Sequence, residues 1–183
     1  MFDLDGVVIN SSPVLRAWFW TRHGFDVGKN DTYKRFDYWT PKDFDEKLLE
    51  VNIADCIIEW KEKFVPYWGA DRALKQIRNT GFPLKFISNR DPRTYYATWQ
   101  WLNTWIGRPF ELCLIGPNKS KKDILYKWET KIYVEDRFKI CEEIAPFVDS
   151  VYCVNHKWNT GRKFLNNNIY RINNLWDLIP ILE

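Results

Sequence analysis

The sequence contains no apolar run that approaches the roughly 20 residues of a membrane-spanning helix. Its first residues, MFDLDG, are acidic where an export signal is basic and then apolar, so we expect a cytoplasmic protein without a signal peptide. Blocks of Lys or Arg are also missing, and a formal net charge of +3 on 183 residues gives little attraction for a long nucleic-acid track. The chain has no internal repeat and no Gly-rich GxxxxGK[ST] loop. These absences leave a globular protein of one domain, with room for an inserted subdomain.

Cysteine and histidine are scarce, with four and two copies. The cysteines form no CxxC pair and have no histidine at zinc-binding spacing. We therefore expect four reduced and mostly buried thiols: Cys56, Cys113, Cys141 and Cys153. His23 and His156 belong to no pattern, so we assign them no role. Aromatic residues are abundant at 17%, including 11 Trp; most should pack in the core, and others could stack on a planar ligand or support a homodimer.

Short apolar runs that end in polar residues recur along the chain and predict strands. They cover residues 1–5, 83–88, 111–115, 131–136, 150–155 and 168–172. Helical patterns lie between or after them and cover residues 92–106, 120–129, 137–147 and 174–182. Strands that alternate with helices of this size form βαβ units, so we expect an α/β fold with a parallel sheet covered on both faces.

Residues 13–81 interrupt this alternation, because they contain no convincing strand. Helical patterns there cover residues 13–23, 41–50, 53–65 and 69–80. The first pattern starts with Ser12-Pro13 and stops at Gly24, which are typical helix boundaries. We therefore expect an all-helical cap at 13–81, inserted into a core formed by residues 1–12 and 82–183.

Polar residues follow several predicted strands at the point where each strand ends or the next helix begins. They are, in chain order, Asp3 and Asp5; Ser88, Asn89 and Arg90; Lys119, Lys121 and Lys122; and Glu135 and Asp136. Ligands of open parallel sheets bind beyond the carboxyl ends of the strands. We therefore expect these side chains to converge on one site.

The ordered motifs DLDGVV, FISNR, SKKD and YVEDR resemble those of the haloacid dehalogenase superfamily of phosphotransferases. DxDG alone is a weak signal, but four motifs in this order, each at a predicted strand end or helix start, are a strong one. The resemblance covers residues 1–12 and 82–183, and it implies a Rossmann-like, three-layer parallel sheet with an inserted helical cap. Only Met1 and Phe2 precede Asp3, whereas the family's first strand has several apolar residues there. Either this strand is unusually short or the chain starts further upstream.

The resemblance implies a phosphatase with an aspartate nucleophile. Asp3 would attack phosphorus to form a phosphoaspartyl intermediate, and Asp5 would protonate the leaving oxygen and then activate water. Asp3, the Asp5 carbonyl and Asp136 would hold Mg²⁺, an ion that prefers oxygen ligands. Glu135 would be an auxiliary ligand.

Phosphate binding is implied for the second and third motifs. The Ser88 hydroxyl and the Asn89 backbone would bind the phosphoryl oxygens. A lysine at the start of the helix before the fourth strand would neutralise their charge. Lys121 is our first choice, because it fits the K-x-D pattern that some family members have before an acidic pair. Lys122 is the second choice, because it fits the R-K-D pattern of others, and Lys119 is the third.

Two narrower resemblances imply different substrates. DGVV, SN, EDR and the closing INNLWDLIPIL are similar to the 5'-nucleotidase branch, including deoxyribonucleotidases, which implies a mononucleotide substrate. Cap aromatics would then stack on the base, with Trp18, Phe36 and Trp39 as candidates. SNRDPRTYYATWQWL, with KKD and EDR, is similar to the 3'-phosphatase domain of phage polynucleotide kinases, which implies a nucleic-acid end held by Arg90. We favour the nucleotide; another small phosphomonoester, or a binding module without turnover, is the alternative.

Overall fold

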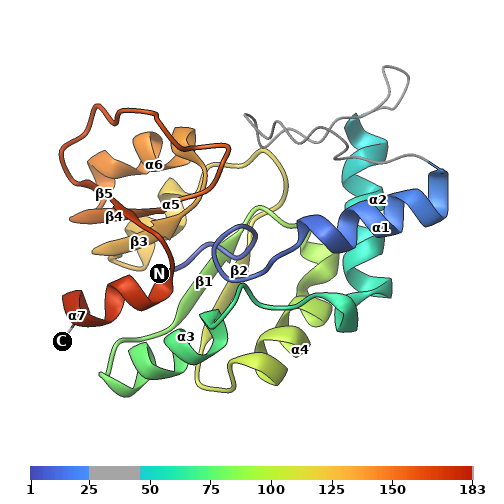
Figure 1. The fold of residues 1–183 in the computed structure, drawn as a ribbon, viewed down its shortest axis with the longest axis horizontal. Coiled ribbons are helices and arrows are strands. Elements are labelled where there is room, and N and C mark those ends of the chain that lie inside the picture. The colour runs from blue at the N-terminus through green and yellow to red at the C-terminus, as the bar shows by residue number, and fades with distance from the viewer. Residues whose placement is uncertain (25–45, 183) are drawn as a thin grey trace.

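The computed structural model describes residues 1–24 and 46–182. The strands named in it all pair in parallel, and each lies within a predicted strand segment (Figure 1). They are β1 (Lys85–Ser88), β2 (Glu111–Leu114), β3 (Ile132–Glu135), β4 (Ser150–Val154) and β5 (Ile169–Ile172). The predicted parallel α/β sheet is therefore confirmed.

The N-terminal residues lie in the middle of this sheet. Phe2 bridges in parallel to Phe86 of β1 and to Val134 of β3, which joins the pair β2–β1 to the group β3–β4–β5. The Phe2 N–H donates to the Lys85 carbonyl and the Asp3 N–H donates to the Val134 carbonyl, each at 2.9 Å. Within the predicted strand over residues 1–5, only Phe2 bridges to the neighbouring strands, because the chain turns after Asp3 and Asp5 bridges to Ile9 within the turn.

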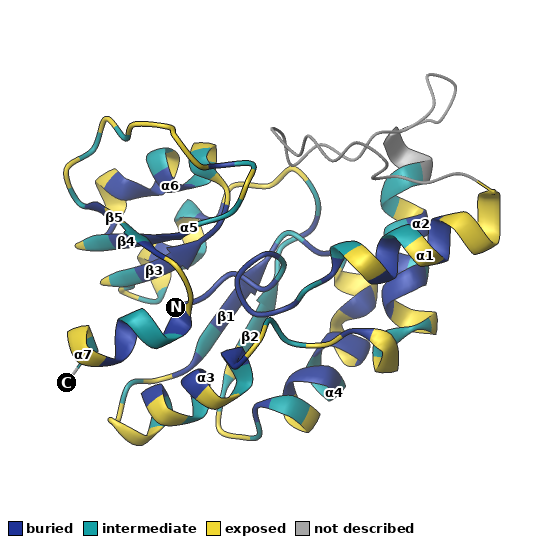
Figure 2. Ribbon diagram, viewed as in Figure 1, coloured by how far each residue is buried: buried dark blue, intermediate teal, exposed yellow. Residues whose placement is uncertain are grey.

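Alternate strand residues face opposite sides of the sheet and belong to two different hydrophobic clusters. Phe86 and Val134 belong to the first cluster, whereas their neighbours Ile87 and Tyr133 belong to the second. The helices that cover the first face are α3 (Ala70–Asn79), α4 (Tyr95–Trp105) and α7 (Ile179–Leu182), and those that cover the second are α5 (Lys122–Lys127) and α6 (Phe138–Ile144). Buried strands between half-exposed helices give the expected three layers (Figure 2).

Helices α1 (Ser12–His23) and α2 (Glu46–Glu59) extend together beyond the sheet (Figure 1). Pro13 lies in the first turn of α1. The helix is capped by Gly24, which has a φ of 72° and whose N–H donates to the Trp20 carbonyl.

The prediction of separate helices at 41–50 and 53–65 is wrong in the described part. Since neither glycine nor proline stands between residues 46 and 59, α2 is continuous there, and a short 3-10 turn follows at Lys61–Lys63. Residues 41–45 lie outside the described residues.

Helix α3 packs with the core elements, although the expected cap at 13–81 includes it. It contacts α7 and the 3-10 turn Leu175–Leu178, and its Leu74 and Ile77 belong to the same cluster as Phe2. The helix therefore covers the sheet rather than extending from it.

The four cysteines are free thiols, and all except Cys113 are buried, as the sequence predicts. Within residues 1–24 and 46–182, every helix is too short or too polar to cross a membrane.

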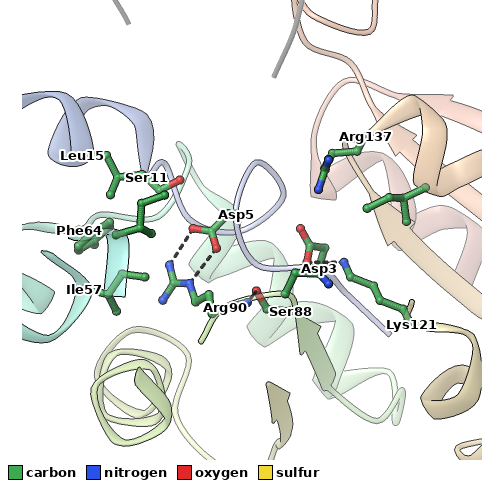
Figure 3. A pocket seen from close by; sticks show the side chains of 13 residues that line it. Asp3, Asp5, Ser11, Leu15, Ile57, Phe64, Ser88, Arg90, Lys121 and Arg137 are labelled. Carbon is green, nitrogen blue, oxygen red and sulfur yellow. Dashed lines mark hydrogen bonds and ion pairs between the residues drawn. The ribbon is translucent and has the colours of Figure 1, made fainter. Parts of the chain in front are cut away.

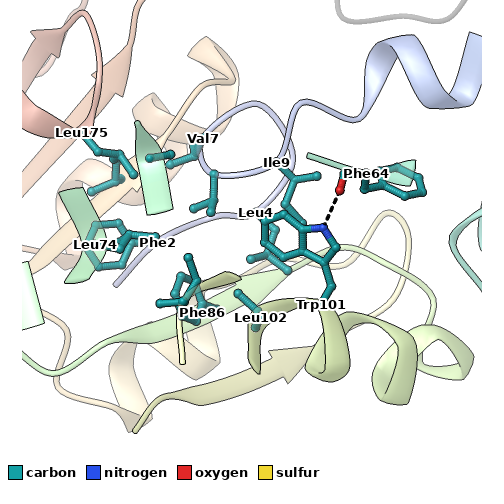
Figure 4. Close-up of a cluster of buried hydrophobic side chains, with 14 of the residues drawn as sticks. Phe2, Leu4, Val7, Ile9, Phe64, Leu74, Phe86, Trp101, Leu102 and Leu175 are labelled. Carbon is teal, nitrogen blue, oxygen red and sulfur yellow. Dashed lines mark hydrogen bonds between the residues drawn. The ribbon is translucent and has the colours of Figure 1, made fainter. Parts of the chain in front are cut away.

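The core that supports the site is built around Phe2, which is 1% exposed (Figure 4). Its ring lies 5.9 Å from the Phe86 ring and 6.4 Å from the Phe82 ring, measured between centroids. Trp101 of α4 packs in the same cluster, and its indole N–H donates to the Phe64 carbonyl at 2.9 Å. The Phe2 side chain thus packs the N-terminal segment against the strands and helices around it.

We predict that Phe2→Ala lowers the free energy of unfolding by roughly 3–5 kcal/mol, because it leaves a cavity in a closely packed core. Urea denaturation followed by circular dichroism measures this change. Tyr126→Ala is the control, since Tyr126 is 81% exposed and its loss should change stability by less than about 0.5 kcal/mol. Equal effects of the two substitutions would contradict the central position of Phe2.

Candidate active site

The turn after Asp3 directs the first motif into the site. The Leu4 carbonyl accepts hydrogen bonds from the N–H groups of Val7, Val8 and Ile9, which closes a tight loop. Gly6 has a φ of 84°, a left-handed conformation that favours glycine. A Cβ atom there would lie 2.4 Å from the Asp136 carboxyl carbon, so the glycine also makes room for the fourth motif.

Lys121 is the lysine that the structure brings to Asp3. Its buried Nζ donates to Asp3 Oδ1 at 2.7 Å, to Glu135 Oε2 at 2.9 Å and to the Tyr133 hydroxyl at 2.7 Å. Burial lowers the pKa of Lys121, but attraction and hydrogen bonds to Asp3 and Glu135 outweigh it, so the pKa lies above its ordinary value. Lys122 points elsewhere, since its Nζ lies 3.6 Å from Glu143 Oε1.

Both oxygens of the buried Glu135 carboxylate are satisfied by protein donors. Oε2 accepts from Lys121 and from the Tyr133 hydroxyl, and Oε1 accepts from the backbone N–H groups of Asp136 and Arg137. Burial raises the pKa of Glu135, but the Lys121 ammonium and these hydrogen bonds hold it below its usual value. Glu135 therefore holds Lys121 in place.

Asp136 differs from Glu135 because one of its oxygens has no partner. Oδ2 accepts from the indole N–H of Trp158 at 2.9 Å, whereas the buried Oδ1 accepts no hydrogen bond from any described residue. Burial, followed by repulsion from Glu135 and Asp3, raises the pKa of Asp136 well above its usual value. Burial likewise raises the pKa of Asp3 to about 7, despite the attraction of Lys121.

The three carboxylates are suited to a divalent cation. One oxygen of each of Asp3, Glu135 and Asp136 lies within 4.8 Å of the others. When all three carboxylates are ionised, they carry two more charges than Lys121 compensates, and a hard divalent cation would neutralise this excess. The unpartnered Asp136 Oδ1 is an oxygen available to such an ion.

Arg90 holds Asp5, a contact that the sequence did not predict. Its Nε donates to Asp5 Oδ2 at 2.8 Å and its second terminal nitrogen donates to Asp5 Oδ1 at 2.7 Å. The other terminal nitrogen donates to the Thr98 hydroxyl of α4 at 3.1 Å. A bidentate pair of this kind sets the orientation of the carboxylate, so Arg90 is directed at Asp5 where we expected it to contact phosphate.

Ser88 and Asn89 extend from the end of β1. Ser88 is buried, and its Oγ accepts from the Arg90 N–H at 3.3 Å. The Asn89 side chain donates to the carbonyls of Gly116 and Lys119, at 3.1 and 2.7 Å, and so holds the loop before Lys121. Both residues line the same cavity as the two aspartates.

This cavity, of about 150 Å³, has a polar floor and an apolar wall (Figure 3). Asp3, Asp5, Ser88, Arg90 and Lys121 form part of the floor. The wall comes from α1, α2 and the segment after them, and includes Leu15, Ile53, Ile57 and Phe64. The site thus offers charge at one end and apolar surface at the other.

The predicted contact of Trp18 with a substrate base is wrong. Trp18 is 2% exposed and belongs to the hydrophobic core between α1 and α2, and its indole N–H donates to Glu59 Oε2 at 3.3 Å. Helical spacing places it on the inner face with Val14 and Leu15, because that face is buried. Phe36 and Trp39 lie outside the described residues.

The segment after β4 contributes residues that the sequence analysis missed. Trp158 contacts Asp136, and the Asn159 side chain donates to the Asp136 carbonyl at 2.6 Å. His156 Nε2 donates to the Gly6 carbonyl at 2.6 Å, and its ring stacks on Trp158 with centroids 4.1 Å apart. Burial lowers the pKa of His156, in keeping with a neutral donor. The strand-end rule could have found this segment, since it directly follows a predicted strand.

Comparison with known proteins identifies structures with a similar fold. The chain matches no protein-family model and no curated protein sequence. Its fold is similar to a haloacid dehalogenase-like family hydrolase from Streptococcus pneumoniae, with a TM-score of 0.69 and 12% identity over 100% of this chain and 96% of that one. It is also similar to CbbY from Rhodobacter sphaeroides in complex with phosphate, with a TM-score of 0.64 and 10% identity over 97% and 94% of the two chains. A third similar structure is a HAD phosphatase from Thermococcus onnurineus, with a TM-score of 0.61 and 15% identity over 99% and 95%. The chain therefore has the haloacid dehalogenase-like fold, with its acidic cluster at the carboxyl ends of the strands.

Proposed function

We propose that this chain is an Mg²⁺-dependent phosphomonoester hydrolase with Asp3 as the nucleophile. One observation carries the proposal: the buried Lys121 joins Asp3 to Glu135, beside an Asp136 oxygen without a partner. A purely structural ion pair does not need the third buried carboxylate, which is unfavourable without a cation. The similar solved structures support the same class of reaction, since one is a phosphatase and another holds phosphate.

The proposed reaction has two steps at phosphorus. A carboxylate oxygen of Asp3 forms a bond to phosphorus, the ester P–O bond breaks, and Asp5 gives its proton to the departing alcohol oxygen. Water then attacks the phosphoaspartyl phosphorus and passes a proton to Asp5, and Asp3 leaves as a carboxylate. Lys121 would compensate the charge of the phosphoryl group, the Ser88 hydroxyl would bind a phosphoryl oxygen, and Arg90 would keep Asp5 oriented.

The proposed ligands of Mg²⁺ are the carboxylates of Asp3 and Asp136 and the backbone carbonyl of Asp5. Glu135 would act by holding Lys121, because its oxygens already accept four hydrogen bonds. When bound, the ion would supply positive charge for the phosphoryl oxygens.

We propose a nucleoside monophosphate as the substrate and α1 and α2 as the cap. The apolar wall of Leu15, Ile53, Ile57 and Phe64 supports this choice, since it gives a flat, weakly polar group a surface to pack against. The alternative of a nucleic-acid end loses its specific support, because Arg90 is engaged by Asp5 and Thr98.

Phosphate release with the wild type and the Asp3→Asn variant tests the function. The substrates are 5'- and 3'-mononucleotides, a 3'-phosphorylated oligonucleotide and an aryl phosphate. We expect Asp3→Asn to lower kcat by roughly a thousandfold or more, because it removes the nucleophile. Its circular dichroism spectrum should stay unchanged, and Asp149→Asn, an exposed site, should keep full activity. Near-wild-type rates of Asp3→Asn would contradict the mechanism, and a preference for the oligonucleotide would overturn the substrate.

Removal of divalent cations tests the metal site without an activity assay. We expect added Mg²⁺ to raise the melting temperature, because saturation at about 100 times Kd stabilises the folded state by roughly 2.7 kcal/mol.

Trp158→Phe should weaken Mg²⁺ binding by about 10–100-fold, since it removes the N–H that orients Asp136. Isothermal titration calorimetry measures the affinity, and Trp68→Phe, at an 86% exposed position, is the control. An Asp136→Asn variant that still binds Mg²⁺ like the wild type would refute the ligand assignment.

Arg90→Lys separates orientation of Asp5 from contact with phosphate. Lysine keeps the charge but loses the bidentate geometry. If Arg90 positions Asp5, kcat should fall by about tenfold or more, and the inhibition constant of inorganic phosphate should change little. Steady-state kinetics with phosphate as a product inhibitor measures both quantities. A large rise in the inhibition constant at unchanged kcat would instead indicate a phosphate ligand.

A further inference from the structure

Ser11 stands where the N-terminal segment enters α1, and it lines the catalytic cavity. The residue is only 5% exposed, and it shares the cavity with Asp5 of the polar floor and Leu15 of the apolar wall. We propose that the Ser11 hydroxyl binds a sugar hydroxyl of the nucleotide and thereby determines which sugar the enzyme prefers. This inference rests on the nucleoside monophosphate substrate proposed above.

The local sequence explains why this hydroxyl does not cap its own helix. A serine directly before a helix usually accepts a hydrogen bond from an N–H group in the first helical turn. Pro13, the second residue of α1, has no N–H group to donate. The Ser11 backbone, with a φ of −77° and a ψ of −28°, also lacks the extended conformation that is typical of capping serines. Its side chain therefore makes no capping hydrogen bond.

The Ser11 hydroxyl is available to a ligand. It makes no hydrogen bond with any residue in the ranges 1–24 and 46–182. A polar group in so buried a residue is unfavourable unless a partner satisfies it, and here the cavity is the side from which a partner can come. A serine hydroxyl both donates and accepts hydrogen bonds, as a sugar hydroxyl does, so the two groups match.

The order of groups along the cavity corresponds to the order of groups in a nucleotide. Figure 3 places Asp3 and Lys121 on one side of Asp5. Ser11 lies on the opposite side, with Leu15 of the apolar wall. In the proposed reaction the leaving oxygen departs opposite Asp3 and takes its proton from Asp5, so the attached sugar lies on the Ser11 side. Ser11 thus stands between the groups proposed for the phosphate and those proposed for the base.

A series of nucleoside 5'-monophosphates with one base tests the contact. The series consists of the ribonucleotide and its 2'-deoxy, 3'-deoxy and 2',3'-dideoxy analogues. With the wild type, we expect kcat/KM to fall by roughly three- to tenfold when the hydroxyl that Ser11 binds is missing, because one neutral hydrogen bond is lost. Comparison of the 2'-deoxy and 3'-deoxy compounds identifies that hydroxyl.

Ser11→Ala should remove this discrimination. We expect kcat/KM for the ribonucleotide to fall to about the value for the dideoxy analogue. The values for the dideoxy analogue and for an aryl phosphate, which has no sugar, should stay within about twofold of the wild type. The urea midpoint should also stay unchanged, because the side chain does not cap α1.

Ser12→Ala is the matched control. Ser12 is the adjacent serine and the first residue of α1, but it is not among the residues that line the cavity. This variant should keep the sugar preference of the wild type. If both substitutions changed the preference equally, the effect would come from the start of the helix, and the assignment to Ser11 would be wrong.

Two kinetic results overturn the inference. In the first, the wild type treats the four nucleotides alike, whether it hydrolyses all of them or none while the aryl phosphate reacts. In the second, Ser11→Ala slows the aryl phosphate as much as the ribonucleotide, which would assign Ser11 to the chemical step and not to the sugar.

Failure of the hydrolase function has a different signature, since the wild type would then release phosphate from none of the compounds, the aryl phosphate included. Calorimetry with the same four nucleotides still measures their binding to the wild type. A tighter ribonucleotide whose advantage is lost in Ser11→Ala would support the contact without the reaction. Equal affinities for the ribonucleotide and the dideoxy analogue would refute it.

Discussion

The ammonium of Lys121, buried between the carboxylates of Asp3 and Glu135, is the interaction on which the rest of the site depends. Charges this deeply buried are stable only when each has a partner. Glu135 finds enough donors, including the Tyr133 hydroxyl and two backbone N–H groups. Asp136 does not, and burial together with repulsion raises its pKa and that of Asp3. When its carboxylates are ionised, the cluster therefore carries an excess of negative charge, which a bound divalent cation would compensate.

The sheet brings these charges together through a very short central segment. Phe2 alone bridges β1 and β3, and its side chain packs against Phe82 and Phe86 on one face. Asp3 follows immediately and lies at the level where β1 and β3 end. Because the chain then turns on Gly6, against which Asp136 packs, the first and fourth motifs are fixed relative to one another.

Positioning of this site extends to side chains with no charge of their own. His156 holds the Gly6 carbonyl, Trp158 holds one oxygen of Asp136, and Asn159 holds its carbonyl. All three come from the segment after β4. The N-terminal segment and the ends of β1, β3 and β4 therefore all contribute to one polar centre. On the other side, the described residues of α1 and α2 that line the cavity, Leu15, Ile53 and Ile57, are apolar, so the cavity has charged groups at one end and apolar groups at the other.

The alternation of apolar runs and helical patterns determined the parallel α/β sheet, since a strand buried on both faces must be apolar along its whole length. Strand-end motifs also determined which residues would converge, because the carboxyl ends of parallel strands meet at one edge. Composition could not decide what each side chain touches there. Lys119, Lys121 and Lys122 look alike in sequence, and only the direction of each side chain at the start of α5 brings Lys121 to Asp3. The sequence likewise could not show that the Arg90 guanidinium pairs with Asp5, which the fold places beside it, or that the Trp18 ring, on the inner face of a helix, joins the core. Sequence periodicity fixes elements and faces over a few residues, whereas ion pairs between residues 3 and 121, or 5 and 90, exist only after the chain has closed on itself.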